Sequence, residues 1–246
     1  MNMKAIRNAA LLAAASVTAA ALVPASASAE TFNFSSGGIN VGGNNFGNVR
    51  TFTGDAGTKV EVSAYSLNGN SLSSSFVGQY AGYGLGVTNS GNDGDHTIDN
   101  NGWVDFVVLQ FDRVMTVSDL GIYGFGDTDL TWAVGNTGTA FDNTLSIPNY
   151  TTLDNLFNTF QQSAGSNSNG LVNRTINGAT AGNLFMVAAN TNNTGWTNPY
   201  DYFKLNSLKA TGAVPEPATW GMMIGGFALV GSAMRRRKTA TTVSFA

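Results

Sequence analysis

Eight aspartates fall in one short part of this chain, and their oxygens are the groups best suited to hold a ligand. Residues 93–129 contain all eight and a single basic residue, Arg113. Ca²⁺ is bound by about six to eight oxygens from carboxylates, amides and backbone carbonyls, which turns rich in Asp, Asn and Gly can supply. We therefore expect a structural Ca²⁺ site here, and no other cofactor. Two groups are the candidates: Asp93, Asp95 and Asp99 in "NDGDHTIDN", and Asp127 and Asp129 in "GDTD".

A second interpretation of these aspartates needs no metal. Their spacing does not meet the EF-hand loop pattern, so no known calcium template selects them. Asp side chains also cap turns by accepting hydrogen bonds from nearby backbone N–H groups. In that case the aspartates order their loops and keep an exported surface soluble.

Residues for catalysis are scarce. The chain has one histidine, His96, in a turn, whereas a Ser-His-Asp site needs a rigidly held base with a buried carboxylate behind it. There is no cysteine, so zinc and thiol chemistry have no ligand set. A glycosidase-type carboxylate pair remains open, because Asp105 or Asp129 could face another acid in the fold. We predict a protein that is not an enzyme, with a glycan hydrolase as an alternative.

Aromatic rings offer a different function, since sugar rings stack on exposed aromatic side chains. Trp103 and Trp132 lie inside strand patterns and are expected in the core. Trp196 lies in the loop "NTNNTGWTNPY", and Tyr83 lies in a Gly-containing turn. Tyr83 and Trp196 are thus the candidates for glycan stacking.

The elements that must position these residues are mostly strands. In "KVEVSAYS", Val60, Val62 and Ala64 alternate with polar residues, a period of two that is typical of a half-buried antiparallel strand. "WVDFVVLQF" is apolar at nearly every position, as a strand covered on both faces would be. Only "TTLDNLFNTFQQ" has helical spacing, with Thr151 or Thr152 as its expected cap. The pattern predicts an all-β domain, an antiparallel, jelly-roll-like β-sandwich with one short helix.

The two ends of the chain differ from its body. Lys4 and Arg7, an apolar run over residues 11–23 and the small residues Ala27-Ser28-Ala29 indicate a signal peptide, residues 1–29, cut before Glu30. The ectodomain is expected over residues 30–213. It carries fourteen acidic and six basic side chains, which argues against nucleic acid as a partner.

The C-terminal end has three parts in a fixed order. Pro215-Glu216-Pro217 and Trp220 come first, then an apolar, Gly-rich stretch to Met234, and then the basic cluster Arg235, Arg236, Arg237 and Lys238. The stretch would rise about 25 Å as a helix and is expected to be a single transmembrane helix. Cations after such a helix remain in the cytoplasm. This places residues 214–238 as a sorting segment and residues 239–246 as a short cytoplasmic tail.

This C-terminal segment resembles the PEP-CTERM sorting signal of exosortase substrates, in the variant in which Trp follows the tripeptide. The resemblance implies that an exosortase, a membrane protease of Gram-negative bacteria, recognises the segment and cuts near the tripeptide. "HTIDNNGWVDF" and "DYFKLNSLKA" in the body resemble small exosortase-dependent surface proteins. That second resemblance implies a β-sandwich ectodomain and leaves its biochemical role open.

Together these observations lead to one expected function. The Sec translocon and signal peptidase would export the chain, which is then tethered in the inner membrane facing the periplasm and passed to the cell surface. There it would serve as a non-enzymatic surface or extracellular-matrix protein of an exopolysaccharide-rich biofilm. The alternatives are a Ca²⁺-stabilised glycan-binding module and, further off, a hydrolase or an ice-binding protein.

Overall fold

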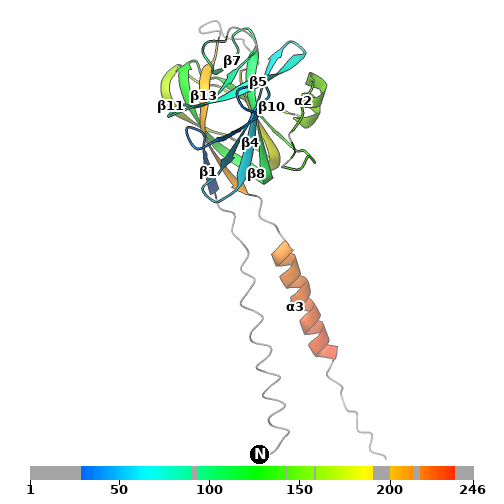
Figure 1. Cartoon of the computed structure of the whole chain (residues 1–246). Coiled ribbons are helices and arrows are strands. Elements are labelled where there is room, and N and C mark those ends of the chain that lie inside the picture. The colour runs from blue at the N-terminus through cyan, green and yellow to red at the C-terminus, as the bar shows by residue number, and fades with distance from the viewer. Residues whose placement is uncertain are drawn as a thin grey trace, which may run out of the picture. The chain divides into compact units, whose positions relative to one another are not determined.

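A computed structural model describes residues 29–89, 93–141, 143, 145–157, 159–190, 200–212 and 217–235. The described residues up to 212 belong to one compact unit, and the helix α3 (Pro217–Arg235) belongs to another. The compact unit consists of strands and one short helix (Figure 1). Its strands are β1 (Ala29–Asn33), β2 (Ile39–Val41), β3 (Val49–Thr53), β4 (Lys59–Asn68), β5 (Ser71–Tyr80), β6 (Gly84–Thr88), β7 (Ile98–Asp99), β8 (Val104–Gly126), β9 (Leu130–Gly135), β10 (Phe160–Ser163), β11 (Ser168–Thr175), β12 (Gly182–Ala189) and β13 (Tyr202–Gly212).

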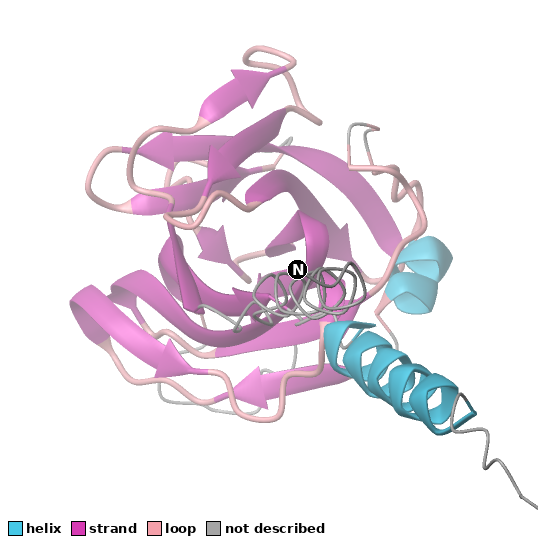
Figure 2. Ribbon diagram, turned by 90° about the horizontal axis from the view of Figure 1, so that it is seen from below, coloured by secondary structure: helices cyan, strands magenta, loops and turns pink. Residues whose placement is uncertain are grey.

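The long strand β8 joins the two halves of the sheet. Its first half pairs with β4 on one side and β12 on the other, and its second half pairs with β13 and β11. β4 also pairs with β5, β5 with β6, and β6 with β13. The five strands β4, β5, β6, β13 and β8 therefore form a closed antiparallel ring, which Figure 2 shows from below with its strands curving around the centre.

The main hydrophobic core includes residues of all five ring strands and extends to β1, β3, β9 and β12, and a second, smaller core is separate from it. Along β8, Val107, Leu109 and Phe111 belong to the main core, whereas Phe106 and Val108 belong to the second. This alternation follows from the two-residue period of a strand. Because both faces of the first half of β8 are covered, residues 104–111 are mostly apolar, as predicted from "WVDFVVLQF".

One short helix covers the second core. The helix α2 (Tyr150–Leu156) buries Leu153, and Phe157 directly after it is fully buried. Its N-cap is Asn149, whose side chain accepts a hydrogen bond from the backbone N–H of Thr152 at 2.9 Å, so the expected caps Thr151 and Thr152 are wrong. The helix is also shorter than predicted, because Phe160 pairs with Ala133 in the sheet as the first residue of β10.

The predicted antiparallel β fold with one short ectodomain helix is confirmed. The alternation in β4 is confirmed as well, with Val60, Val62 and Ala64 buried. The two-layer, jelly-roll-like sandwich is not confirmed, because the strands hydrogen-bond as one sheet that closes on itself. Of the predicted signal peptide, residues 1–29, only Ala29 is described, as the first residue of β1. The predicted tail over residues 239–246 lies outside the described residues.

Candidate functional site

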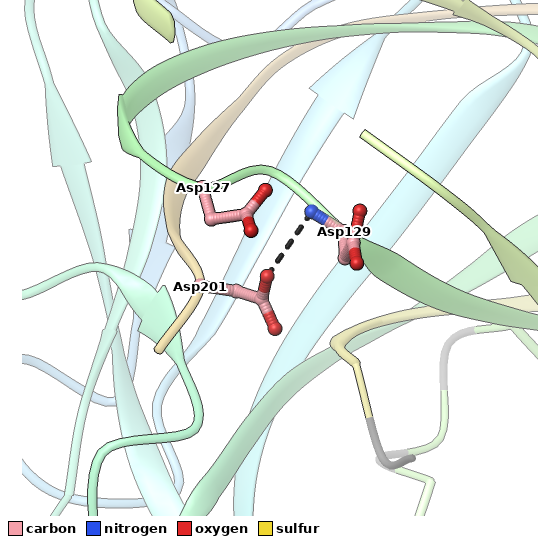
Figure 3. Close-up of side chains that lie close together, drawn as sticks. All are labelled: Asp127, Asp129 and Asp201. Carbon is pink, nitrogen blue, oxygen red and sulfur yellow. Dashed lines mark hydrogen bonds between the residues drawn. The ribbon is translucent and has the colours of Figure 1, made fainter. Parts of the chain in front are cut away.

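Three aspartates converge where β8, β9 and β13 meet. Asp127 follows β8, Asp129 precedes β9, and Asp201 precedes β13 (Figure 3). One carboxylate oxygen from each lies within 4.8 Å of the others. A parallel bridge between Asp127 and Asp201 holds the segments together, with the Tyr202 N–H donating to the Asp127 carbonyl at 2.9 Å.

Asp201 is the buried member of this aspartate cluster. Its Oδ1 accepts from the Asp129 N–H at 3.1 Å, and its Oδ2 accepts from Asn100 Nδ2 at 2.8 Å and from the Asn190 N–H at 3.2 Å. No Lys or Arg forms a salt bridge with the cluster among the described residues. Burial, and then the charges of Asp129 and Asp127, raise the pKa of Asp201 to about 7.

Three uncompensated carboxylates this close together have two ways to lower their repulsion. They can retain a proton, which the raised pKa of Asp201 favours, or they can share a cation with oxygen preference such as Ca²⁺. The grouping of Asp127 with Asp129 agrees with the sequence prediction. Asp201 was not predicted as a ligand, although it is the first residue of the recognised stretch "DYFKLNSLKA".

The other predicted group, Asp93, Asp95 and Asp99, is arranged differently. The carboxylate of Asp93 accepts from the backbone N–H groups of Asn89, Asp95 and His96 at 3.1–3.2 Å, which is turn capping. These aspartates line a cavity of about 230 Å³ beside Trp103. Among the described residues, however, only Asp127, Asp129 and Asp201 bring three ligand atoms together.

Asp99 and Asp105 are buried carboxyls near one end of the ring. Asp99 accepts from Thr97 Oγ1 at 2.8 Å, and burial raises its pKa to about 6. Asp105 is completely buried and hydrogen-bonded to Ser66, which in turn contacts Ser75 Oγ at 2.6 Å. Burial raises the pKa of Asp105 to about 8, and its Oδ2 has no hydrogen-bond partner among the described residues.

The single histidine is held as a loop residue. His96 has a positive φ of 51°, its Nδ1 lies 2.8 Å from Thr88 Oγ1, and its ring stacks on Tyr80 at 6.0 Å between centroids. The described contacts of the ring therefore involve a hydroxyl and an aromatic ring, and no carboxylate orients it. This geometry does not provide a Ser-His-Asp site.

The aromatic candidates take three different positions. Tyr83 is 43% exposed and lines a cavity of about 410 Å³, as a stacking role would require. Trp132 is buried in the main core, as expected. Trp103 was also expected in the core but is only half-buried, because it precedes β8 and lines the smaller cavity. Trp196 lies outside the described residues.

The C-terminal segment forms the helix α3, nineteen residues long. Apolar side chains along it are exposed, among them Ile224, Phe227 and Leu229. None of the helices in the described ranges is both long and apolar enough to span a lipid bilayer. Pro215 and Glu216, Arg236 to Lys238, and Ala27 at the expected signal-peptide cut lie outside the described residues, as do the side chains of Pro217 and Trp220.

Comparison with protein families identifies this segment. Residues 213–238 match the model of the PEP-CTERM protein-sorting motif. The chain carries a PEP-CTERM sorting motif. The motif indicates export and exosortase-dependent sorting to the cell surface of a Gram-negative bacterium. No curated protein and no solved structure matched this PEP-CTERM chain. The resemblance of its body to small surface proteins, and the Trp-containing variant of the motif, stay predictions.

Proposed function

We propose that this PEP-CTERM chain is a non-enzymatic protein of the cell surface or extracellular matrix, released there after an exosortase cuts near residues 215–217. The observation that carries the proposal is the order of parts at its end. The matched motif begins directly after β13, the apolar helix α3 starts at Pro217 of the tripeptide, and the basic cluster starts at Arg235, the last residue of the helix. The folded ectodomain lies on the N-terminal side of the cut, so it would be released from the membrane as an intact domain.

The helix α3 is proposed as the transient inner-membrane tether. Exposure of apolar side chains such as Ile224 and Leu229 to water is unfavourable, so these side chains favour an apolar environment. At about 1.5 Å per residue the helix rises about 28 Å, close to the ~30 Å of a bilayer core. Arg235 to Lys238 would hold its end in the cytoplasm.

Replacing Arg235, Arg236, Arg237 and Lys238 by serine is expected to impair membrane retention of the uncut precursor. The change removes the cations that resist transfer across the membrane, so part of the precursor should slip into the periplasm or insert in the wrong orientation. Fractionation of cells that lack the exosortase measures the membrane-bound share. Lys59 and Lys209 replaced by serine give a control with two lost surface charges in the ectodomain. Equal retention of both variants would contradict the proposed role of the cluster.

The start of the compact unit supports export with signal-peptide removal. β1 begins at Ala29 and Glu30 is already buried, its carboxylate accepting from the N–H groups of Ala56 and Thr58 at 3.0 and 2.8 Å. Ala29 pairs with Thr211 in β13, four residues before Pro215. Both proposed cuts therefore lie at the same end of the domain, which suits a domain handled by a signal peptidase and an exosortase at one membrane.

A catalytic role receives little support from the arrangement of acids. The converging oxygens of Asp127, Asp129 and Asp201 lie within 4.8 Å of one another. Inverting glycosidases keep their carboxyl groups about 6.5–9.5 Å apart to admit a water, and retaining ones about 5–5.5 Å. The cavities of about 410 and 340 Å³ are lined by other residues. The aspartate cluster is thus better suited to a structural than to a hydrolytic role.

We further propose that Ca²⁺ stabilises the domain at Asp127, Asp129 and Asp201. Extracellular modules bind Ca²⁺ with dissociation constants of about 10⁻⁴–10⁻³ M. At about 10 mM Ca²⁺ this raises the free energy of unfolding by about 1.4–2.7 kcal/mol, and the melting temperature by several degrees.

Thermal melts in Ca²⁺ and in a chelator measure the calcium effect. The rise in melting temperature with Ca²⁺ should disappear in Asp129→Asn. It should persist in Asp154→Asn, which changes an exposed aspartate on α2. A melting temperature that is the same in Ca²⁺ and in chelator would refute the calcium proposal.

A further inference from the structure

We propose that the 410 Å³ cavity beside Tyr83 binds a sugar ring of a polysaccharide. The cavity is lined by four aromatic rings, one lysine and two further polar residues: Tyr80, Tyr83, Phe125, Tyr202, Lys204, Asp95 and Thr97. Its volume lies within the ~300–1,000 Å³ usual for small-molecule sites. The inference rests on the proposed surface location for its biological setting and supplies the ligand that such a protein would bind there.

The cavity is built from segments that are far apart in the sequence. Tyr80 ends β5 and Phe125 lies near the end of β8, while Tyr202 and Lys204 come from β13. The loop after β6 adds Asp95 and Thr97. Tyr83 packs against Tyr123 at 4.8 Å and Phe125 at 5.8 Å between ring centroids, so the exposed ring is supported from behind.

The turn that carries Tyr83 is fixed to β13. The carbonyls of Gly82 and Tyr83 both accept from Asn206 Nδ2, at 3.1 and 3.2 Å. Gly84 has a φ of +113°, and a Cβ there would lie 2.2 Å from the Leu205 carbonyl oxygen. Because the turn is held close to the neighbouring strand, the ring is positioned before any ligand arrives, which reduces the entropy lost on binding.

Lys204 gives the cavity wall a positive charge. Its Nζ lies 4.3 Å from the centroid of Tyr80 and 5.3 Å from that of Phe125. It donates to the carbonyl of Asp95 at 3.2 Å and to the carbonyl of His96. An ammonium has three N–H donors, so one is left over from these two contacts. Burial lowers the pKa of Lys204 to about 8, and no described carboxylate forms a salt bridge with it.

Lys204 already lies where an external cation would contact the Tyr80 ring. An aromatic box of this kind would attract an ammonium group, but the protein's own ammonium already lies over the Tyr80 ring. A choline-like or methylated-lysine ligand would be repelled by it at close range. The cavity is therefore not an aromatic cage for an external cation.

A purely apolar ligand fits poorly as well. It would cover Lys204 and the exposed Asp95 without offering them hydrogen-bond partners, and the loss of water from such groups is unfavourable. A sugar ring meets both requirements, because its C–H face can lie on an aromatic ring while its hydroxyls both donate and accept. Asp95 would accept from one hydroxyl, and the remaining N–H of Lys204 would donate to another.

Affinity electrophoresis tests this with three polysaccharides as probes: alginate, dextran and hydroxyethyl cellulose, cast separately into native gels. The full chain is purified in a mild detergent. We expect at least one polymer to retard it, and Tyr83→Ala to weaken the apparent affinity for that polymer by about tenfold, or about 1.4 kcal/mol, because the variant removes the ring on which the sugar would lie. Phe46→Ala is the matched control, because Phe46 is 54% exposed on the β2–β3 loop and outside the cavity.

Three outcomes would overturn the inference. The first is no retardation by any of the three polymers. The second is an equal loss in Tyr83→Ala and Phe46→Ala, with melting curves showing that both variants are folded. The third is displacement of the bound polymer by tetramethylammonium chloride but not by sodium chloride of equal ionic strength. The assay involves no exosortase, so its failure leaves the sorting proposal standing, and a failure of sorting leaves the binding result intact.

Discussion

Replacing Pro215, Glu216 and Pro217 together by alanine is expected to leave nearly all of the chain uncut and attached to the cell in its native host. These residues form the tripeptide of the motif matched over residues 213–238, and two residues separate them from β13, which ends at Gly212. A protease that recognises the tripeptide loses both rigid prolines and the carboxylate between them. The folded ectodomain should not be affected, because the change lies beyond its last strand.

Mass spectrometry of the protein from cells and medium measures this effect and locates both cut sites. The wild-type chain should appear outside the inner membrane as a fragment that begins at Glu30 and ends near the tripeptide. Pro148→Ala is the control, since Pro148 is an exposed proline in the loop before α2. If the triple variant and the wild type are processed alike, the sorting role of the tripeptide is wrong. The same spectra report any attached glycan.

Asp105→Asn is expected to stabilise the ectodomain strongly at alkaline pH. The raised pKa means that the folded state binds the Asp105 proton more tightly than the unfolded state. The contribution of Asp105 to the free energy of unfolding is therefore fully present below about pH 4. It is lost as the pH rises through the folded pKa of about 8. A pKa that differs by one between the folded and unfolded states corresponds to about 1.36 kcal/mol. The variant should therefore gain several kcal/mol in free energy of unfolding near pH 8 and little near pH 4.

Asparagine suits this position because it resembles the protonated acid. Its amide oxygen can accept from Ser66 Oγ as Oδ1 of the carboxyl does, and it carries no charge into the core. Urea unfolding at several pH values measures the difference, with Asp154→Asn as the exposed control. A variant that is less stable than the wild type near pH 8 would show that Asp105 is ionised and has a favourable partner.

The sequence alone determined those features of the protein that depend on residues close together in the chain. The alternation of Val60, Val62 and Ala64 with polar residues predicted a strand with one buried face, because side-chain direction in a strand depends only on neighbouring positions. The sorting segment was also readable, since a protease and a membrane recognise residue order, apolar length and charge in a linear stretch. The grouping of Asp127 with Asp129 was local for the same reason.

Only the tertiary structure determined which strands meet. The alternation of apolar and polar residues predicts that one face of a strand is buried, but it does not predict what covers that face. It therefore could not distinguish a two-layer sandwich from a ring closed by pairing of β4 with β8 and of β6 with β13. The helix was predicted too long because Phe160 fits a helical spacing, yet pairing with Ala133 in the sheet satisfies its backbone. Asp201 joins Asp127 across more than seventy residues, and the lining of the Tyr83 cavity comes from strands β5, β8 and β13. Such long-range groupings depend on strand register and closure, which no local pattern of side chains encodes.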